Sequence, residues 1–502
     1  MTIYQMFKIV VLSSVISVVL AALTGCGGGG SPVGQGPGLG PGDNNALLVG
    51  QYTFSLTGQT VPEGAVVAIA GSFTADGNGH LGGVQDVNSK LGVNTGKFGG
   101  TYSLGTDGRG NAVLGIQAGC ANWQFTMVSH THGLLTCLNT SMTASGTIDL
   151  QDPSSLSVAA LKGNYVFSFS GLGLPANAQS GAGLAVMAGD WTMDGNGNIT
   201  RGEMDVNDLS GIQQDIPVSG TYSVGANGRG IATLNSSFTT QKFAFYIANR
   251  GDLKFVETDA QPVVSGEVLA QASGPFTPLT LKGQLAFTLS GVDSNNVPIT
   301  VGGIFSSDGN GGISNGVLDS NDGGTVLLGS TLTGNYALST TGRGLANLTS
   351  SPALQLAFYP AANGTIELVD IGSGLGVVGM ARGQIGLPFS VASTSGNYAP
   401  SFTGTNLISS GAEEDITGQL IADGAGNLNG VLDVNNFGSI FQKNPISGSS
   451  YTMATNGRGT AVLNTASGTF DMQTYQIGPG TILFLESDQG RVIVGIAEKQ
   501  QF

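Results

Sequence analysis

Apolar and polar side chains alternate along many short segments of the chain. In residues 165–170 the aromatic side chains of Tyr165, Phe167 and Phe169 alternate with smaller ones, and residues 242–248 repeat the pattern. A period of two places successive side chains on opposite faces of a strand. No long segment shows the helical period, and turns rich in glycine and asparagine separate the short segments. The pattern therefore predicts an all-β protein.

The same order of segments and turns occurs four times. Each unit opens near a glycine followed by an aromatic or apolar segment, passes an Asp-Gly-Asn-Gly or Asp-Gly-Ala-Gly turn, and reaches a Gly-Arg-Gly turn. The first kind of turn starts at Asp76, Asp194, Asp308 and Asp423. The arginines of the second kind are Arg109, Arg229, Arg343 and Arg458. The repeats predict four similar modules in tandem.

One unit, residues 163–271, contains eight alternating segments and no crossover helix. Eight sequential antiparallel strands lose their exposed edges when they close into an up-and-down barrel. We therefore predict four tandem antiparallel eight-stranded meander barrels, each packed inside or holding one small ligand. The alternative is a β-propeller in which each unit supplies two four-stranded blades.

The strand number and order of the unit resemble those of lipocalin and calycin barrels. The resemblance is architectural, since Tyr165 follows Gly163-Asn where that family carries a Gly-x-Trp signature. The fourth unit has Pro400 where the others have phenylalanine. Proline lacks a ladder donor, so we expect an edge or bulged strand there and an open barrel.

Composition and the repeats together divide the chain. Gly and Pro dominate the segment before the first unit, which therefore has no core of its own. We predict a signal peptide at 1–25, a Gly/Pro-rich tether at 26–46, and β-modules at 47–151, 161–271, 281–384 and 395–502. Short links between the modules favour beads on a semi-rigid string.

The first residues carry a targeting signal. Lys8 precedes an apolar run at residues 9–20, and Leu23-Thr24-Gly25-Cys26 follows. This order resembles the lipobox of bacterial lipoproteins, which implies cleavage before Cys26 and lipidation of that residue. Several acyl chains anchor a protein stably, and the glycine after Cys26 favours the outer membrane. The resemblance thus implies an exported protein, anchored in the cell envelope through lipid.

Charge and cysteine content fit export. The formal net charge is −15, so the surface repels nucleic acid and anionic lipid. Cys120 and Cys137 are the remaining cysteines, and we predict a disulfide, worth roughly 3 kcal/mol in the chain-entropy model. His130 and His132 lie between them, but the spacing matches no standard zinc site.

The repeated acids allow two interpretations. The candidate calcium ligands are Asp76, Asp86, Asp194, Asn196, Asp205, Asp308, Asp319, Asp423 and Asp433. Calcium takes carboxylate and amide oxygens, but Asp-Gly and Asn-Gly also supply the positive φ angles of tight hairpins. We favour turns over calcium and expect no obligatory cofactor. Each later acid has an asparagine two positions on, at Asn88, Asn207, Asn321 and Asn435.

The four Gly-Arg-Gly arginines indicate a geometric demand, since any solvated turn would accept lysine or serine. We predict that they cap one barrel end by bonding to backbone or to an acid such as Glu257 or Asp205. The alternative is a row of anion-binding arginines.

Binding is the function that the pattern favours. The connections after the first and third strands differ between units, and variable loops on a constant scaffold usually carry recognition. No catalytic motif is present. We predict a non-enzymatic, monomeric envelope protein for multivalent binding or display, with a glycan, a protein or a small apolar molecule as ligand. A structural surface spacer is the alternative, and a glycan-active hydrolase using two acids is the third.

Overall fold

The computed structural model describes residues 44–502 except 173–183, 209–210, 238, 260–262 and 410. The predicted signal peptide, Cys26 and nearly all of the predicted tether lie outside the described residues. The described residues form one compact unit. Within the described part of the chain, no helix is long and apolar enough to cross a membrane.

The first module is a closed antiparallel barrel in which each strand pairs with the next and the last pairs with the first. Its strands are β1 (Val49–Thr60), β2 (Val66–Asp76), β3 (His80–Ser89), β4 (Gly92–Leu104), β5 (Arg109–Gly115), β6 (Asn122–Ser129), β7 (His132–Asn139) and β8 (Met142–Leu150). A short 3₁₀ helix, η1 (Asn45–Leu47), precedes it.

In the second module the fourth strand of the meander is divided in two, at Val218. The strands are β9 (Gly163–Leu172), β10 (Leu184–Met193), β11 (Asn198–Asn207), β12 (Ile212–Pro217), β13 (Ser219–Val224), β14 (Arg229–Asn235), β15 (Thr240–Asn249), β16 (Asp252–Glu257) and β17 (Val263–Ala270). Because β10 pairs with both β9 and β11, and β17 pairs with β9, this sheet also closes.

The third and fourth modules are closed barrels as well. The third contains β18 (Gly283–Asp293), β19 (Pro298–Ser307), β20 (Gly312–Asp322), β21 (Thr325–Leu338), β22 (Gly344–Thr349), β23 (Leu354–Pro360), β24 (Thr365–Asp370) and β25 (Leu375–Gly383). The fourth contains β26 (Gly396–Asn406), β27 (Ala412–Ala422), β28 (Asn427–Asn436), β29 (Ser439–Met453), β30 (Arg458–Thr465), β31 (Gly468–Gly478), β32 (Thr481–Glu486) and β33 (Arg491–Lys499).

The predicted fold is confirmed: the described chain is all-β, with four closed eight-stranded antiparallel barrels, and the propeller alternative is excluded. The described helices are single 3₁₀ turns. Those in the links are η2 (Pro153–Ser155), η3 (Val158–Leu161), η4 (Pro278–Leu281) and η5 (Val391–Thr394).

The prediction that Pro400 opens the fourth barrel is wrong. Pro400 pairs with Ala497 of β33, and β26 also pairs with β27 on both sides of the proline. The β26–β27 ladder is interrupted only between Tyr398 and Ser401, because proline has no N–H to donate. The hydroxyl of Thr417 donates to the Pro400 carbonyl at 3.1 Å, so the strand stays in place.

The barrel interiors are filled by their own side chains. Each module has its own apolar core, such as the Phe54, Phe73 and Trp123 rings of the first. The cavities found inside the barrels measure about 30 Å³ in the third and fourth modules and about 10 Å³ in the second. Such volumes hold a water molecule or two rather than a ligand.

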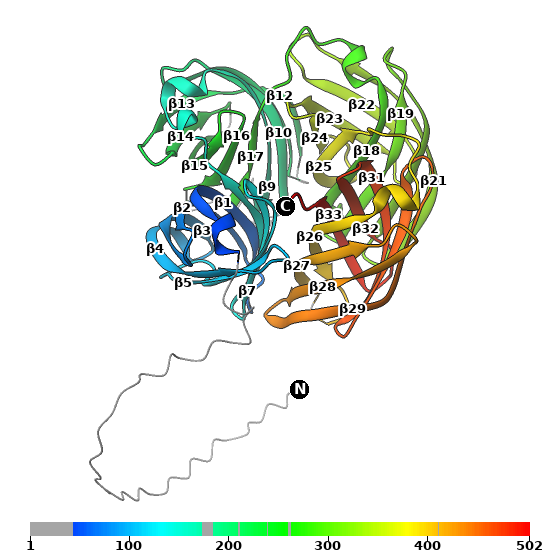
Figure 1. Ribbon diagram of the computed structural model, residues 1–502. Coiled ribbons are helices and arrows are strands. Elements are labelled where there is room, and N and C mark those ends of the chain that lie inside the picture. Colours follow the sequence, from blue (N-terminus) through cyan, green and yellow to red (C-terminus); the bar gives the residue numbers. More distant parts are fainter. Residues whose placement is uncertain (1–43, 173–183, 209–210, 238, 260–262, 410) are drawn as a thin grey trace, which may run out of the picture. The chain divides into compact units, whose positions relative to one another are not determined.

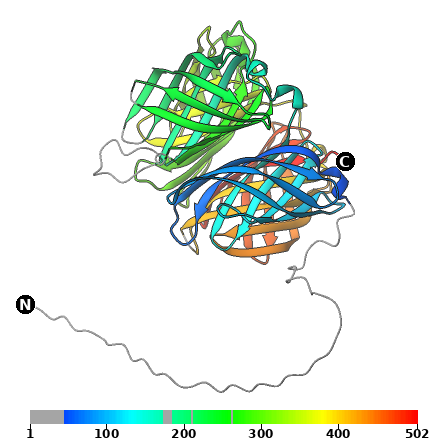
Figure 2. The ribbon, with the colours of Figure 1, turned by 90° about the vertical axis from the view of Figure 1, so that its left-hand side faces the viewer.

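The modules are not beads on a string, because their outer walls pack together in a cycle (Figure 1). An apolar cluster joins the first module to the second around Tyr246, the second to the third around Tyr359, and the third to the fourth around Tyr475. A smaller cluster of Val128, Leu134 and Ala399 joins the fourth back to the first. Because the links are short and the outer walls are apolar, the barrels pack against one another (Figure 2).

Candidate functional site

The arginine of each Gly-Arg-Gly turn reaches into the preceding module. Arg229 of the second module donates two hydrogen bonds to Asp86 of the first, from Nε at 2.7 Å and Nη2 at 2.8 Å. The hydroxyl of Tyr246 adds a third bond to the same carboxylate at 2.6 Å. Asp86 is fully buried, so a bidentate guanidinium and a phenol replace its water.

The same triad recurs at the next two interfaces. Arg343 bonds Asp205 at 2.8 and 2.6 Å, with Tyr359 as third donor. Arg458 bonds Asp319 at 2.8 and 2.7 Å, with Tyr475 as third donor. Each aspartate is fully buried. Burial and the neighbouring carboxylate raise the pKa of the tyrosine hydroxyls, which keeps them protonated as donors.

A reduced version closes the cycle. Arg109 of the first module donates from Nη2 to Asp433 of the fourth, and its buried Nε has no hydrogen-bond partner. Thr126 stands where the other modules have tyrosine and donates instead to the carbonyl of Gly418 at 2.8 Å. The fourth-to-first contact is thus built on the same plan with fewer bonds.

The asparagine two residues after each buried aspartate holds the same neighbour. Asn435 donates to the carbonyls of Cys137, Asn139 and Met142 at 2.8 to 3.0 Å. Asn207 and Asn321 bond the equivalent hairpins of the third and fourth modules, and Asn88 bonds that of the second. One Asp-x-Asn segment per module therefore fixes two points of the next barrel.

A glutamine after the last strand of each module makes a further repeated contact. Gln151 donates to the Ile247 carbonyl at 2.6 Å, and Gln271 donates to that of Thr341 at 2.9 Å. Gln384 bonds the fourth module in the same way. Gln500 closes the cycle by bonding the Asp107 and Met127 carbonyls at 2.8 and 3.1 Å.

These contacts correct the predicted position of the arginines. They lie between modules rather than over one barrel end: Asp205 is the partner of Arg343, and Glu257 bonds none of them through its carboxyl. The sequence carried a signal for this pairing, since Asp-x-Asn and Gly-Arg-Gly recur in equal number. Nothing in the sequence showed that each arginine bonds the aspartate of the preceding module rather than that of its own.

The two predicted calcium acids of a module have separate partners. Asp76, Asp194, Asp308 and Asp423 bond the backbone N–H groups of their own turns, as Asp194 does with Asn196 and Asn198 at 2.7 and 3.0 Å. Asp86, Asp205, Asp319 and Asp433 are the arginine partners. Among the described residues, no group of three or more His, Cys, Asp or Glu is placed to hold a metal ion.

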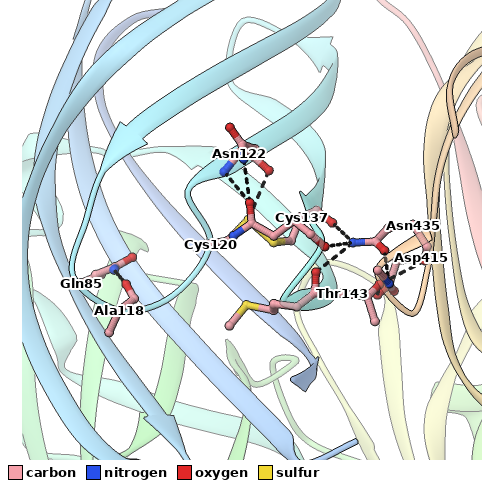
Figure 3. Close-up of a disulfide and its surroundings, with 11 residues drawn as sticks. Gln85, Ala118, Cys120, Asn122, Cys137, Thr143, Asp415 and Asn435 are labelled. Carbon is pink, nitrogen blue, oxygen red and sulfur yellow. Dashed lines mark hydrogen bonds between the residues drawn. A yellow bond between two sulfur atoms is a disulfide. The ribbon is translucent and has the colours of Figure 1, made fainter. Parts of the chain in front are cut away.

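The Cys120–Cys137 disulfide lies at the fourth-to-first contact, with Cα atoms 5.8 Å apart. Figure 3 shows Asn435 reaching from the fourth module toward the hairpin that carries Cys137. Beside it, Thr143 donates to the buried Asp415 carboxylate at 2.6 Å. The disulfide thus belongs to a module contact as well as to its own barrel.

All four modules together line one further cavity, which we call the central cavity. Its volume is about 500 Å³. Its walls come mainly from the last two strands of the first three modules and from β33 of the fourth. The lining side chains that carry charge are His132, Asp149, Asp252, Lys254, Glu267, Glu367, Arg382 and Glu498. Apolar lining comes from Leu134, Leu269, Met380 and Ile496.

Two of the cations are saturated by acids. Lys254 Nζ lies 2.6 Å from Glu267, 3.1 Å from Asp252 and 3.3 Å from Asp149. His132 lies 2.7 Å from Asp149 and 2.9 Å from Glu498 of the fourth module. Burial opposes the charge of His132, but these two carboxylates raise its pKa to about 10. The imidazole is therefore a cation at neutral pH.

Two of the acids are hard to ionise. Burial, with repulsion from Glu267, raises the pKa of Glu367 to about 8. Burial also raises the pKa of Asp252 to about 7, because repulsion from Asp149 and Glu267 offsets much of the attraction of Lys254. Five acids face three cations in this cavity, so protons on Asp252 and Glu367 balance most of the excess negative charge.

Equivalent wall positions differ in every module. Asp149, Leu269, Arg382 and Glu498 each occupy the third position after the glycine of the last strand. The contact residues Arg, Asp and Asn, by contrast, are the same in all four. The frame is therefore repeated, whereas the walls of the central cavity are not, and the cavity presents a chemically asymmetric surface. Sequence reasoning missed this cavity, since it attributed recognition to the loops.

The recognition role of the variable loops remains a prediction, and the loop at 171–184 lies mostly outside the described residues.

No protein-family model matches the chain, and no curated protein matches it.

Among solved structures, transferrin binding protein B from serogroup B Neisseria meningitidis is 10% identical to this chain, with a TM-score of 0.22. The match spans 72% of this chain and 81% of the chain of that protein. The Trp-176-Ala mutant of transferrin binding protein B from Haemophilus parasuis Hp5 is 10% identical, covers 89% and 86%, and scores 0.18. CghA with Sch210972 is 10% identical, covers 67% and 89%, and scores 0.17. Scores this low do not establish a common fold.

Proposed function

We propose that this protein is a non-enzymatic binding protein of the cell envelope, and that it takes one small ligand in the central cavity. The observation that carries the proposal is the cavity itself, about 500 Å³ in volume and lined by all four modules. That volume falls within the roughly 300–1,000 Å³ of ordinary small-molecule sites. The cavities found inside the second, third and fourth barrels, at about 30 Å³ or less, are too small for a ligand.

The repeated contacts support this role. Four similar barrels held by the same Arg–Asp, Asn and Gln bonds form a pre-organised frame, which reduces the entropy that binding must overcome. The walls combine charged groups with apolar surface, as in sites that fix the orientation of a ligand. A structural spacer would require neither a cavity nor walls that differ between repeats.

The lipid anchor is part of the proposal and is supported by Leu23-Thr24-Gly25-Cys26, which resembles a lipobox. We expect Cys26→Ala to shift the protein from the membrane fraction to the soluble fraction of the envelope. A Cys26→Ala protein that stays with the membranes contradicts the anchor and leaves the binding role to its own test.

Binding is tested by thermal shift against a library of small metabolites, peptides and glycans. Ile496→Trp places a large ring in the cavity, and Ile421→Trp makes the same change at a partly exposed position on β27. We expect at least one compound to stabilise the wild type and Ile421→Trp but not Ile496→Trp. If no compound stabilises the wild type, or if both variants respond alike, the cavity is not the binding site.

A further inference from the structure

The chemistry of the central cavity indicates which ligands it accepts, and Arg382 is the first indication. Its Nε donates to the Thr365 hydroxyl at 2.9 Å. Across the described residues, its two terminal guanidinium nitrogens make no hydrogen bond or ion pair, whereas Lys254 and His132 are fully engaged. A guanidinium with two free donors on one edge matches a carboxylate in bidentate geometry.

Glu267 is the second indication. One of its carboxylate oxygens accepts from Lys254, while the side chain remains 43% exposed in the cavity. Among the described residues, its other carboxylate oxygen makes no hydrogen bond or ion pair. Glu267 is thus an acid with capacity for a second cation.

The region that includes both groups is partly apolar and crowded with charge. Leu134, Met380 and Ile496 line the same cavity. Arg382, Glu267 and Glu367 line this cavity too, and the charges of Glu267 and Arg382 shift the pKa of Glu367 in opposite directions. A ligand that fills this space needs an anionic end, a cationic end and an apolar part.

We propose that the central cavity binds small zwitterionic molecules with a free carboxylate and a free ammonium group around an apolar part, as in short peptides with unblocked ends. Arg382 holds the carboxylate, Glu267 holds the ammonium group, and Leu134, Met380 and Ile496 contact the apolar part. This inference rests on the proposed binding function, since it assigns the chemistry of the same cavity.

Isothermal titration calorimetry with the full chain tests the assignment. The probes are the tripeptide Ala-Leu-Ala, its N-acetylated form, which lacks the ammonium group, and its C-amidated form, which lacks the carboxylate. We expect the unblocked peptide to bind and each blocked form to bind at least about tenfold more weakly, which corresponds to roughly 1.4 kcal/mol. Equal binding of the three forms, or no binding of the unblocked form at millimolar concentration, overturns the proposal.

Two variants assign the ends. Arg382→Gln should weaken binding of the unblocked peptide about tenfold and abolish the difference between it and the amidated form. Glu267→Gln should do the same for the acetylated form, and it leaves Lys254 two acidic partners. Arg250→Gln is the control, because this arginine lies in the turn between β15 and β16, outside the cavity lining. It should change neither the affinity for the unblocked peptide nor the differences between the three peptide forms. If Arg382→Gln still discriminates the amide, the assignment of the carboxylate is wrong.

The library experiment separates the two claims. If neutral compounds such as glycans stabilise the wild type and Ile496→Trp abolishes the effect, the binding role stands and the zwitterion assignment falls. If no compound of any class responds, both fall together.

Discussion

At the residue scale, the buried Arg–Asp pairs decide how the modules hold one another. Burying a carboxylate is costly unless a charged partner and further donors replace its water. Asp205 has such replacement from Arg343 and Tyr359. Asp433 has a single guanidinium N–H from Arg109 and a backbone donor, the N–H of Lys443. The four interfaces are therefore similar in plan but unequal in strength.

We expect Arg343→Gln to lower the free energy of unfolding by about 3–5 kcal/mol, because it leaves Asp205 buried without a cation. Urea unfolding measures the loss. Arg109→Gln is the matched comparison within the same chain and should cost less, because only one guanidinium bond is removed. A loss below about 1 kcal/mol for Arg343→Gln would mean that the pair behaves like a surface ion pair.

The buried carboxyl of Glu257 makes stability depend on pH. Burial raises its pKa to about 9, against 4.5 in the absence of the fold. Between those values the native state holds a proton that the unfolded state has released, so the free energy of unfolding falls as pH rises, by at most about 1.4 kcal/mol per pH unit. Glu257→Gln should flatten the fall between pH 5 and pH 9 in urea unfolding.

The exposed turn residue Glu63 offers a control, and Glu63→Gln should leave the wild-type slope unchanged. Asp370 and Glu486 occupy the equivalent place in the third and fourth modules and also have raised pKa values, chiefly through burial. Because these two carboxyls remain in every variant, part of the fall in the free energy of unfolding with pH persists. An identical slope in Glu257→Gln and wild type would show that Glu257 ionises freely in the native state.

At the element scale, the strands were predictable and their partners were not. Alternation in 165–170 and the turn glycines establish eight strands per module, because period and turn chemistry are local properties. The partner of Asp86 is 143 residues away, and a repeat pattern does not show which module an outward side chain faces. Pro400 shows the same limit. The missing N–H of proline does interrupt the β26–β27 ladder, as predicted, but the barrel stays closed.

Strand β26 determines which group Thr126 meets at the closing contact. Pro400 leaves the Gly418 carbonyl of β27 without a ladder donor, and the Thr126 hydroxyl of the first module supplies one at 2.8 Å. We expect Thr126→Val to cost about 1–3 kcal/mol, the price of a buried carbonyl without a partner. In a Pro400→Ala background, where an N–H is restored, the cost should fall below about 1 kcal/mol.

A double-mutant cycle of these two changes in urea unfolding measures the coupling. Thr53, the residue before Phe54 in the first module, also bonds a glycine carbonyl of the neighbouring strand, that of Gly71 at 2.9 Å. Thr53→Val therefore serves as the comparison, since its cost should not depend on Pro400. Additive costs for Thr126→Val and Pro400→Ala would separate the threonine from the proline.

At the scale of the whole molecule, closure of the cycle creates the central cavity. Three interfaces join modules that are consecutive in the chain, whereas the fourth joins β6 and β7 to β26 and β27 without a link. It has the smallest apolar cluster and the single guanidinium bond. No sequence pattern predicts this contact, because Arg109 and Asp433 lie 324 residues apart and each repeats a motif with three other possible partners.

Residues 500 and 501 hold this last interface. Gln500 bonds the Asp107 and Met127 carbonyls, and the Gln501 N–H donates to the Val128 carbonyl at 2.8 Å. We expect deletion of residues 500–502 to speed amide hydrogen exchange in β6 and β27 at least about tenfold, because local opening of the interface becomes more frequent. Exchange in β15 and β23, at the linked interfaces, should stay unchanged.

Gln271→Ala removes the equivalent bond at an interface whose modules remain linked, so the high effective concentration of the neighbours should limit its effect. Faster exchange in β23 of Gln271→Ala than in β6 of the deletion variant would show that the unlinked contact is not the place where the cycle opens.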